Sequence, residues 1–106
     1  MYKAVAIWGT REDSDIEAFE KDYREVHVPL ARKVPGLKKL ILTRIDSGLE
    51  GAKPPFYRVA ELYFDSKEAL EKAQQTPEWI AMRENGARMV ERFGVTLAAA
   101  FGTPQE

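Results

Sequence analysis

The sequence contains no cysteine and a single histidine, His27, and these shortages exclude several kinds of chemistry. Without a thiol the chain forms no disulfide, zinc ribbon, iron–sulfur cluster or cysteine nucleophile. One histidine is too few for a multi-histidine or histidine–carboxylate centre for zinc or iron, and carboxylates alone bind a hard cation only weakly. We therefore expect no bound metal and no cofactor. A haem ligated by His27 is an open alternative that no second feature supports.

Blocks of like charge, long apolar runs and nucleotide-binding motifs are also missing. The 106 residues include 16 basic and 17 acidic side chains, for a net charge of −1, so nothing predicts a nucleic-acid or anionic-membrane partner. No segment has the pattern of a signal peptide or a membrane span, which makes the cytoplasm the expected location. Phosphate-binding glycine motifs and G-x-S-x-G are absent, which argues against a nucleotide-dependent enzyme. The length indicates one domain over residues 1–106.

Apolar patterning predicts two β-α-β units joined by a loop. Runs rich in apolar and β-branched residues favour strands over 2–8, 37–45, 56–64 and 95–101. One helix follows the polar segment 11–15. A second helical region begins after Asp65, the predicted N-cap, and restarts at Thr76-Pro77-Glu78. This order is typical of an α+β, ferredoxin-like fold with a four-stranded antiparallel sheet and both helices on one face.

The strand predicted over 56–64 is apolar on both of its faces. Ala60, Leu62 and Phe64 alternate with Val59, Glu61 and Tyr63, so both faces need to be covered. We expect Tyr57, Val59 and Tyr63 on the face without helices. Because such a face is too apolar for water, we predict a homodimer.

The stretch 23–36 combines the histidine with a proline placed inside a helical pattern. Its apolar stripe consists of Ile16, Phe19, Tyr23, Val26, Leu30 and Val34. His27 follows Tyr23 by four residues, so both side chains project from nearly the same face. Pro29 disfavours helical dihedrals at Val28, and we expect the helix to kink or restart there with Pro29 in the first turn of the new segment.

The candidate site residues each have a functional and a structural interpretation. His27 titrates near neutrality and suits acid–base catalysis, but a neutral core imidazole also fits the pattern. Glu61 is an acid–base partner, a member of an ion pair with Arg44 or Arg58, or a solvent-exposed residue. Ligand-binding candidates are Trp8, Tyr23, Tyr57, Tyr63 and Arg44, although aromatic residues at these spacings commonly belong to a core, and a basic residue in a strand commonly lies at a solvated edge.

One motif resembles a known family. It reads Phe19-x-x-x-Tyr23-x-x-x-His27-x-Pro29-Leu30-Ala31, followed by Val34-Pro35-Gly36-Leu37, by 59–66 and by Thr76-Pro77-Glu78. It resembles the EthD family of the dimeric α/β-barrel superfamily. The resemblance implies two subunits that join their sheets into one barrel, with a pocket between each sheet and its own helices.

The resemblance also implies a range of activities. Related barrels include monooxygenases without a bound cofactor, lactone isomerases and haem-binding members, and in isomerase-like relatives a first-helix histidine is the acid–base group. His27 matches that position, whereas the cysteine partner of some relatives is absent. We expect a small, largely apolar organic ligand and cofactor-free oxygenase or isomerase chemistry, with His27 as base and Tyr23 or Glu61 orienting the substrate. The alternatives are a non-catalytic binding protein and a structural dimer without a pocket.

Overall fold

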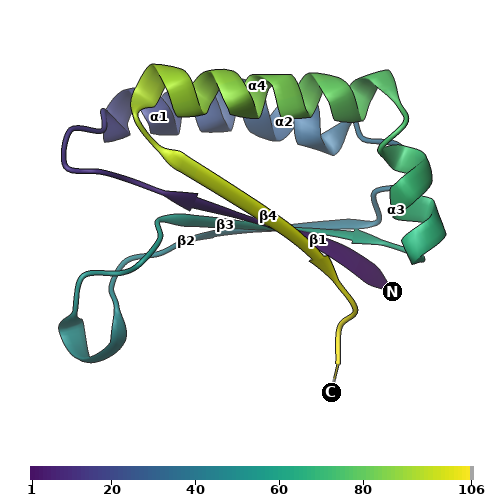
Figure 1. The fold of residues 1–106 in the computed structure, drawn as a ribbon, viewed down its shortest axis with the longest axis horizontal. Helices are drawn as coiled ribbons and strands as arrows, with labels where there is room; N and C mark the ends of the chain where they lie inside the picture. The colour runs from purple at the N-terminus through teal and green to yellow at the C-terminus, as the bar shows by residue number, and fades with distance from the viewer. Residues whose placement is uncertain (106) are drawn as a thin grey trace.

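The computed structural model, which describes residues 1–105, is one antiparallel sheet with its main helices on one face (Figure 1). The strands are β1 (Tyr2–Gly9), β2 (Lys39–Arg44), β3 (Arg58–Phe64) and β4 (Thr96–Gly102). They lie in the order β2-β3-β1-β4, with every neighbouring pair antiparallel. The predicted ferredoxin-like α+β architecture is confirmed.

The helices are α1 (Ile16–Asp22), η1 (Tyr23–His27), α2 (Val28–Arg32), α3 (Lys67–Ala73) and α4 (Pro77–Phe93), with a short turn η2 (Leu49–Gly51) in the long loop. The run from α1 to α2 lies beside α4 over the sheet, and α3 lies at one end of it (Figure 1). The cap of α3 differs from the prediction. Ser66, not Asp65, is the N-cap, because its side chain accepts from the Ala69 amide, while Asp65 pairs with Lys38 at 3.6 Å.

A widened turn, η1, joins α1 to α2 in the stretch around the histidine. The Val28 amide donates to the Tyr23 carbonyl five residues back, which is the π-helical pattern. Val28 keeps helical dihedrals, with φ −61° and ψ −44°, so the predicted departure from helical geometry there is wrong. The extra residue in the turn accommodates Pro29 without breaking the helix. Pro29 lies in the first turn of α2, which begins at Val28, as predicted.

The widened turn also changes which side chains are buried. Tyr23 is 2% exposed and stacks on His27 one turn later. Val26 was predicted in the buried stripe, but it is 41% exposed. The added residue rotates the position three after Tyr23 away from the sheet while keeping the position four after it in line.

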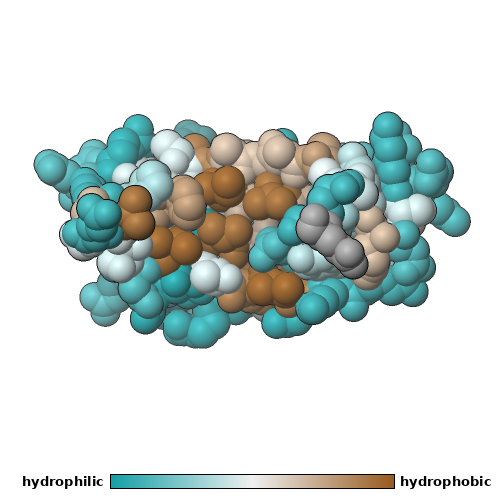
Figure 2. Space-filling view, turned by 90° about the horizontal axis from the view of Figure 1, so that it is seen from below, coloured by the Kyte–Doolittle hydropathy of each residue, from teal (hydrophilic) through white to brown (hydrophobic). Residues whose placement is uncertain are grey.

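The face of the sheet without helices is apolar at its centre, as Figure 2 shows from below. Residues on this face alternate with those that face the helices. Across the strands, Ile7 lies between Val59 and Ala98, and Val5 lies between Glu61 and Ala100. Charged and polar residues surround this patch (Figure 2). Within residues 1–105, no helix has the length and apolar character needed to cross a membrane.

Candidate functional site

A cavity of ≈ 600 Å³ lies between the sheet and the helices. Small side chains on the sheet leave room for it. Ala60, Ala6 and Ala99 are direct partners on β3, β1 and β4, so three neighbouring strands present only methyl groups to the cavity. Larger apolar side chains complete the walls, among them Val28, Leu42, Leu62, Met82, Leu97 and Phe101. The size and apolar lining suit a small organic molecule.

His27 lines this cavity from the widened turn η1. Its ring lies 5.2 Å from the Trp8 ring at 86° and 5.9 Å from the Tyr23 ring at 19°, measured between centroids and ring planes. Burial lowers the pKa of His27 from its ordinary value of 6.5, opposed by the hydrogen bond to Asn85 and by the negative charge of Asp22. The imidazole is therefore neutral at pH 7 and available as a base.

Asn85, on α4, holds one nitrogen of this imidazole. Its Oδ1 lies 2.8 Å from His27 Nδ1, and its side chain is buried at 6% exposure. Asn85 was not among the predicted site residues, because an asparagine in a helix carries no pattern of its own. The available signal was a polar residue at a position where the spacing of Met82 and Met89 predicts burial.

Two buried hydrogen-bond donors, on aromatic rings that contact His27, have no partner within the described chain. They are Trp8 Nε1 and Tyr23 Oη, and both residues line the cavity. Such groups are rare in folded proteins because each forfeits the hydrogen bonds that water would supply. Burial raises the pKa of Tyr23 to about 12, so its hydroxyl stays protonated and available as a donor.

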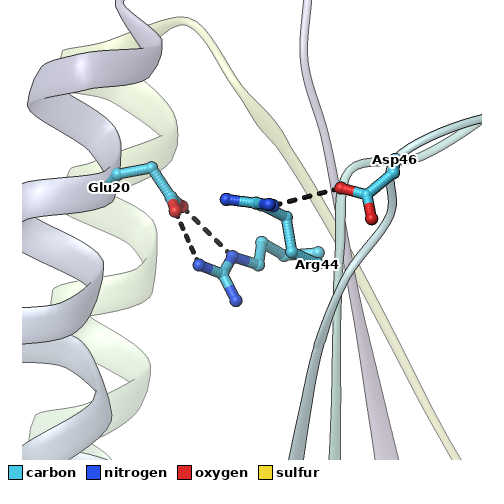
Figure 3. A network of polar contacts seen from close by, with 4 residues as sticks. Glu20, Arg44 and Asp46 are labelled. Carbon is cyan, nitrogen blue, oxygen red and sulfur yellow. Dashed lines mark hydrogen bonds and ion pairs between the residues drawn. The ribbon is translucent and has the colours of Figure 1, made fainter.

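An ion pair supports Tyr23 from the side of the sheet. Arg58 donates to Glu20 through Nη2 at 2.6 Å and through Nε at 3.1 Å, which is a bidentate arrangement. The Arg58 guanidinium also lies 4.9 Å from the centre of the Tyr23 ring. Figure 3 shows the Glu20 side chain directed from its helix toward the strands of the sheet. Neither the Glu20–Arg58 pair nor its role beneath Tyr23 was predicted, because it joins residues 38 positions apart.

Four predicted site residues lie away from His27. Glu61 and Tyr63 are on the opposite face of the sheet, where Glu61 pairs with Lys3 at 2.8 Å and accepts from the Tyr63 hydroxyl at 3.3 Å. Tyr57 precedes β3 and packs against Phe19 with centroids 6.0 Å apart, so its predicted place on the uncovered face is wrong. Arg44 is an exposed residue of β2 that pairs with Asp46 at 3.2 Å (Figure 3).

The structure thus divides the predicted residues into two groups. Trp8, Tyr23 and His27 meet at the cavity. The pairing of Glu61 with His27 is wrong, because side chains at alternate positions of a strand point to opposite faces and Ala60 and Leu62 are those that face the helices. Among residues 1–105, no group of three or more histidine, cysteine, aspartate or glutamate side chains is placed to hold a metal ion.

Comparison with known proteins identifies the family. The EthD domain model matches residues 11–92. An uncharacterized 11.0 kDa protein from the thcB-thcC intergenic region of Rhodococcus erythropolis is 34% identical over 100 residues, which are 92% of this chain and 90% of that protein. An ethyl tert-butyl ether D (EthD) family protein from Bacillus halodurans matches in crystal structure with a TM-score of 0.87 and 31% identity over 99% of both chains. The chain belongs to the EthD family.

A more distant structure shares the fold alone. It is SnoaB from Streptomyces nogalater, described as a cofactor-independent oxygenase, which matches with a TM-score of 0.65 and 15% identity. The match covers 99% of this chain and 93% of SnoaB.

The burial of His27 predicts how the stability of the protein depends on pH. Because the folded protein has the lower pKa, below about pH 6.5 the unfolded chain binds a proton that the folded chain rejects. The free energy of unfolding should therefore decrease as the pH falls through about 6.5 and level off below the pKa of the folded state. Urea denaturation at several pH values measures this change, and His27→Leu should show less of it.

The single histidine also gives a direct check. Its Cε1 proton, followed by NMR, should titrate with a midpoint below 6.5. A midpoint at or above that value would contradict a buried, neutral imidazole.

The unpartnered hydroxyl of Tyr23 predicts an unusual response to its removal. A buried polar group without a hydrogen bond costs about 1–3 kcal/mol, so Tyr23→Phe should leave the free energy of unfolding unchanged or raise it by up to about 1 kcal/mol. Tyr63→Phe is the matched control, since that hydroxyl bonds Glu61 and its removal should not stabilise. Urea denaturation compares the two, and a marked loss in Tyr23→Phe would mean that its hydroxyl has a bonding partner.

Proposed function

We propose that this EthD-family protein is a homodimer that binds a small, largely apolar organic molecule in the cavity between sheet and helices, with His27 as the base that removes a proton from it. The observation that carries the proposal is a neutral, cavity-lining imidazole with one nitrogen held by the protein. The whole chain acts as one domain, and the cytoplasm stays the predicted location.

The neighbours of the imidazole support this role. Its Nδ1 is engaged by Asn85, which leaves Nε2 to meet a ligand. Trp8 and Tyr23, whose rings contact the imidazole, each carry a donor without a partner in the described chain, Nε1 and Oη. An oxygen atom on the ligand that gains negative charge as the proton leaves is the group that such donors stabilise. We therefore assign to Tyr23 the orienting role for which the sequence offered both Tyr23 and Glu61.

Proton removal is the first step of two reactions. A carbanion or enolate formed beside a carbonyl takes back a proton at another carbon, which is an isomerisation. Alternatively it reacts with dioxygen: a CH₂ group becomes C=O, and the second oxygen atom leaves as water, so the reaction needs no external reductant. The likeness to SnoaB, described as a cofactor-independent oxygenase, favours the second reaction among enzymes of this fold.

A second candidate function is non-catalytic binding, in which the cavity holds an intermediate for partner enzymes. It is favoured by the surroundings of His27, whose hydrogen-bond partner within residues 1–105 is an amide and not an acid. Glu61, the predicted acidic partner, pairs with Lys3 on the other face. The two candidates differ in turnover, not in binding.

The homodimer follows from the apolar face that has no helices over it. Val5, Ile7, Ile41 and Val59 are only half-buried in the single chain, and the strand register puts them on the same face of the sheet as Glu61. Figure 2 shows that this face is apolar at its centre. Contiguous exposed apolar surface of this kind marks an interface. A second copy is the natural partner, because two such faces cover each other.

Deuterium exchange into a simple ketone tests the base directly. The probe is 2-indanone, a small apolar ketone with acidic C–H bonds, incubated in D₂O and followed by NMR. The wild type should accelerate exchange, and His27→Gln should lose most of this, by about 100-fold, as general-base catalysis contributes 10²–10⁴. Val26→Ala, on the exposed side of the same turn, is the control. Binding of 2-indanone without accelerated exchange would favour the non-catalytic function.

Light scattering tests the dimer. We expect the wild type to have the mass of two chains at micromolar concentration, and Ile7→Glu to reduce it to one, because the new charge would be buried between the sheets. Ile80→Glu makes the same chemical change at a residue of α4 that is 48% exposed and should leave the dimer intact. A monomeric wild type would contradict the proposal.

A further inference from the structure

We propose that Asn85 is a positioning residue that fixes His27 as the tautomer with its proton on Nδ1, and so keeps a basic lone pair on Nε2. The use of that lone pair in proton transfer rests on the proposed function. The tautomer itself does not, and it is measurable in the absence of any substrate.

The burial of Asn85 is the first observation. Apart from aromatic residues, it is the one polar side chain within residues 1–105 that is buried, at 6% exposure. A buried amide is unfavourable unless its polar atoms are hydrogen-bonded. Its Oδ1 lies 2.8 Å from His27 Nδ1. Since an amide oxygen only accepts, Nδ1 must donate and therefore carries the proton. A neutral imidazole then has its lone pair on Nε2.

The close approach of α4 to the imidazole is the second observation. The next residue, Gly86, has no side chain, and a Cβ there would lie 3.6 Å from His27 Cε1 and 3.3 Å from Leu97 Cδ2. The backbone of α4 therefore lies close to the ring at this point, within van der Waals reach of a single added carbon. Trp8 lies edge-on to the imidazole, and Tyr23 stacks on it. The ring is held by aromatic contacts on two sides and by a hydrogen bond on a third.

The neutral charge of Asn85 is the third observation. A carboxylate in its place would stabilise the imidazolium and leave the base protonated at neutral pH. Asp22 is the carboxylate whose charge acts on His27, and its effect is smaller than that of burial. An amide therefore selects the tautomer while leaving most of the imidazole unprotonated at neutral pH.

Nitrogen NMR tests the proposal directly, because a ¹⁵N-labelled chain without a histidine tag gives signals from one imidazole. In the wild type, Nδ1 should show the shift of a protonated nitrogen and Nε2 that of an unprotonated one. In Asn85→Leu, which is similar in size, both shifts should move toward averaged values or exchange places. Arg88→Ala, on the exposed side of α4, is the control. Unchanged shifts in folded Asn85→Leu would overturn the proposal.

A second variant keeps the test decisive if Asn85→Leu does not fold. Asn85→Asp has the same shape and still accepts from Nδ1, so the tautomer should persist. The new charge should raise the NMR titration midpoint of His27 above that of the wild type by at least about one pH unit. An unchanged midpoint would show that residue 85 does not contact Nδ1 in solution.

Exchange of 2-indanone separates this inference from the proposed function. If the wild type accelerates exchange, Asn85→Leu should lose about tenfold or more of it, and the pH profile of Asn85→Asp should shift to higher pH. If the nitrogen shifts of Asn85→Leu change as expected but the wild type does not accelerate exchange, the positioning role is supported and the catalytic role is overturned. Exchange that is lost while the tautomer is unchanged would overturn the positioning role.

Discussion

The widened helical turn between Tyr23 and His27 is the constraint on which the site depends. It absorbs Pro29 without ending the helix, and it keeps the two rings in line over the cavity. Trp8, rising from β1, then fits edge-on to both of them. π-type turns are uncommon and concentrate at functional sites, because an ordinary α-helix would be more stable where nothing has to be positioned. Here the turn places an imidazole beside an apolar cavity.

The alternation of side chains in the sheet separates the chemistry of the two faces. On the helix side, alanines of three adjacent strands leave room for a ligand. On the other side, the Lys3–Glu61 ion pair lies among apolar residues. A single strand therefore contributes to the cavity and to the proposed subunit interface, since successive residues point in opposite directions. The helix-facing residues decide the space for a ligand, and the outward ones decide how copies of the chain associate.

Much of the architecture was predictable, because periodicity is a local property of the chain. The four strands and the fold followed from apolar spacing, and the start of α2 near Val28 followed from Pro29. The start of α4 at Thr76-Pro77 is as predicted. The errors have local causes as well. The prediction for Val26 assumed a regular α-helix, and the cap of α3 moved by one residue because a serine hydroxyl competed with the preceding aspartate. Neither error changed the fold.

The site divides in the same way. The sequence by itself determined that the one histidine lies beside a proline on an apolar face, because both properties depend on residues a few positions apart. It also favoured a dimer, which stays a proposal. Only the tertiary structure decided that Asn85 is the partner of His27 and that Glu61 is not. The His27–Asn85 hydrogen bond spans 58 positions. Which side chains meet across such a distance depends on how helices pack on the sheet, and no local pattern records it.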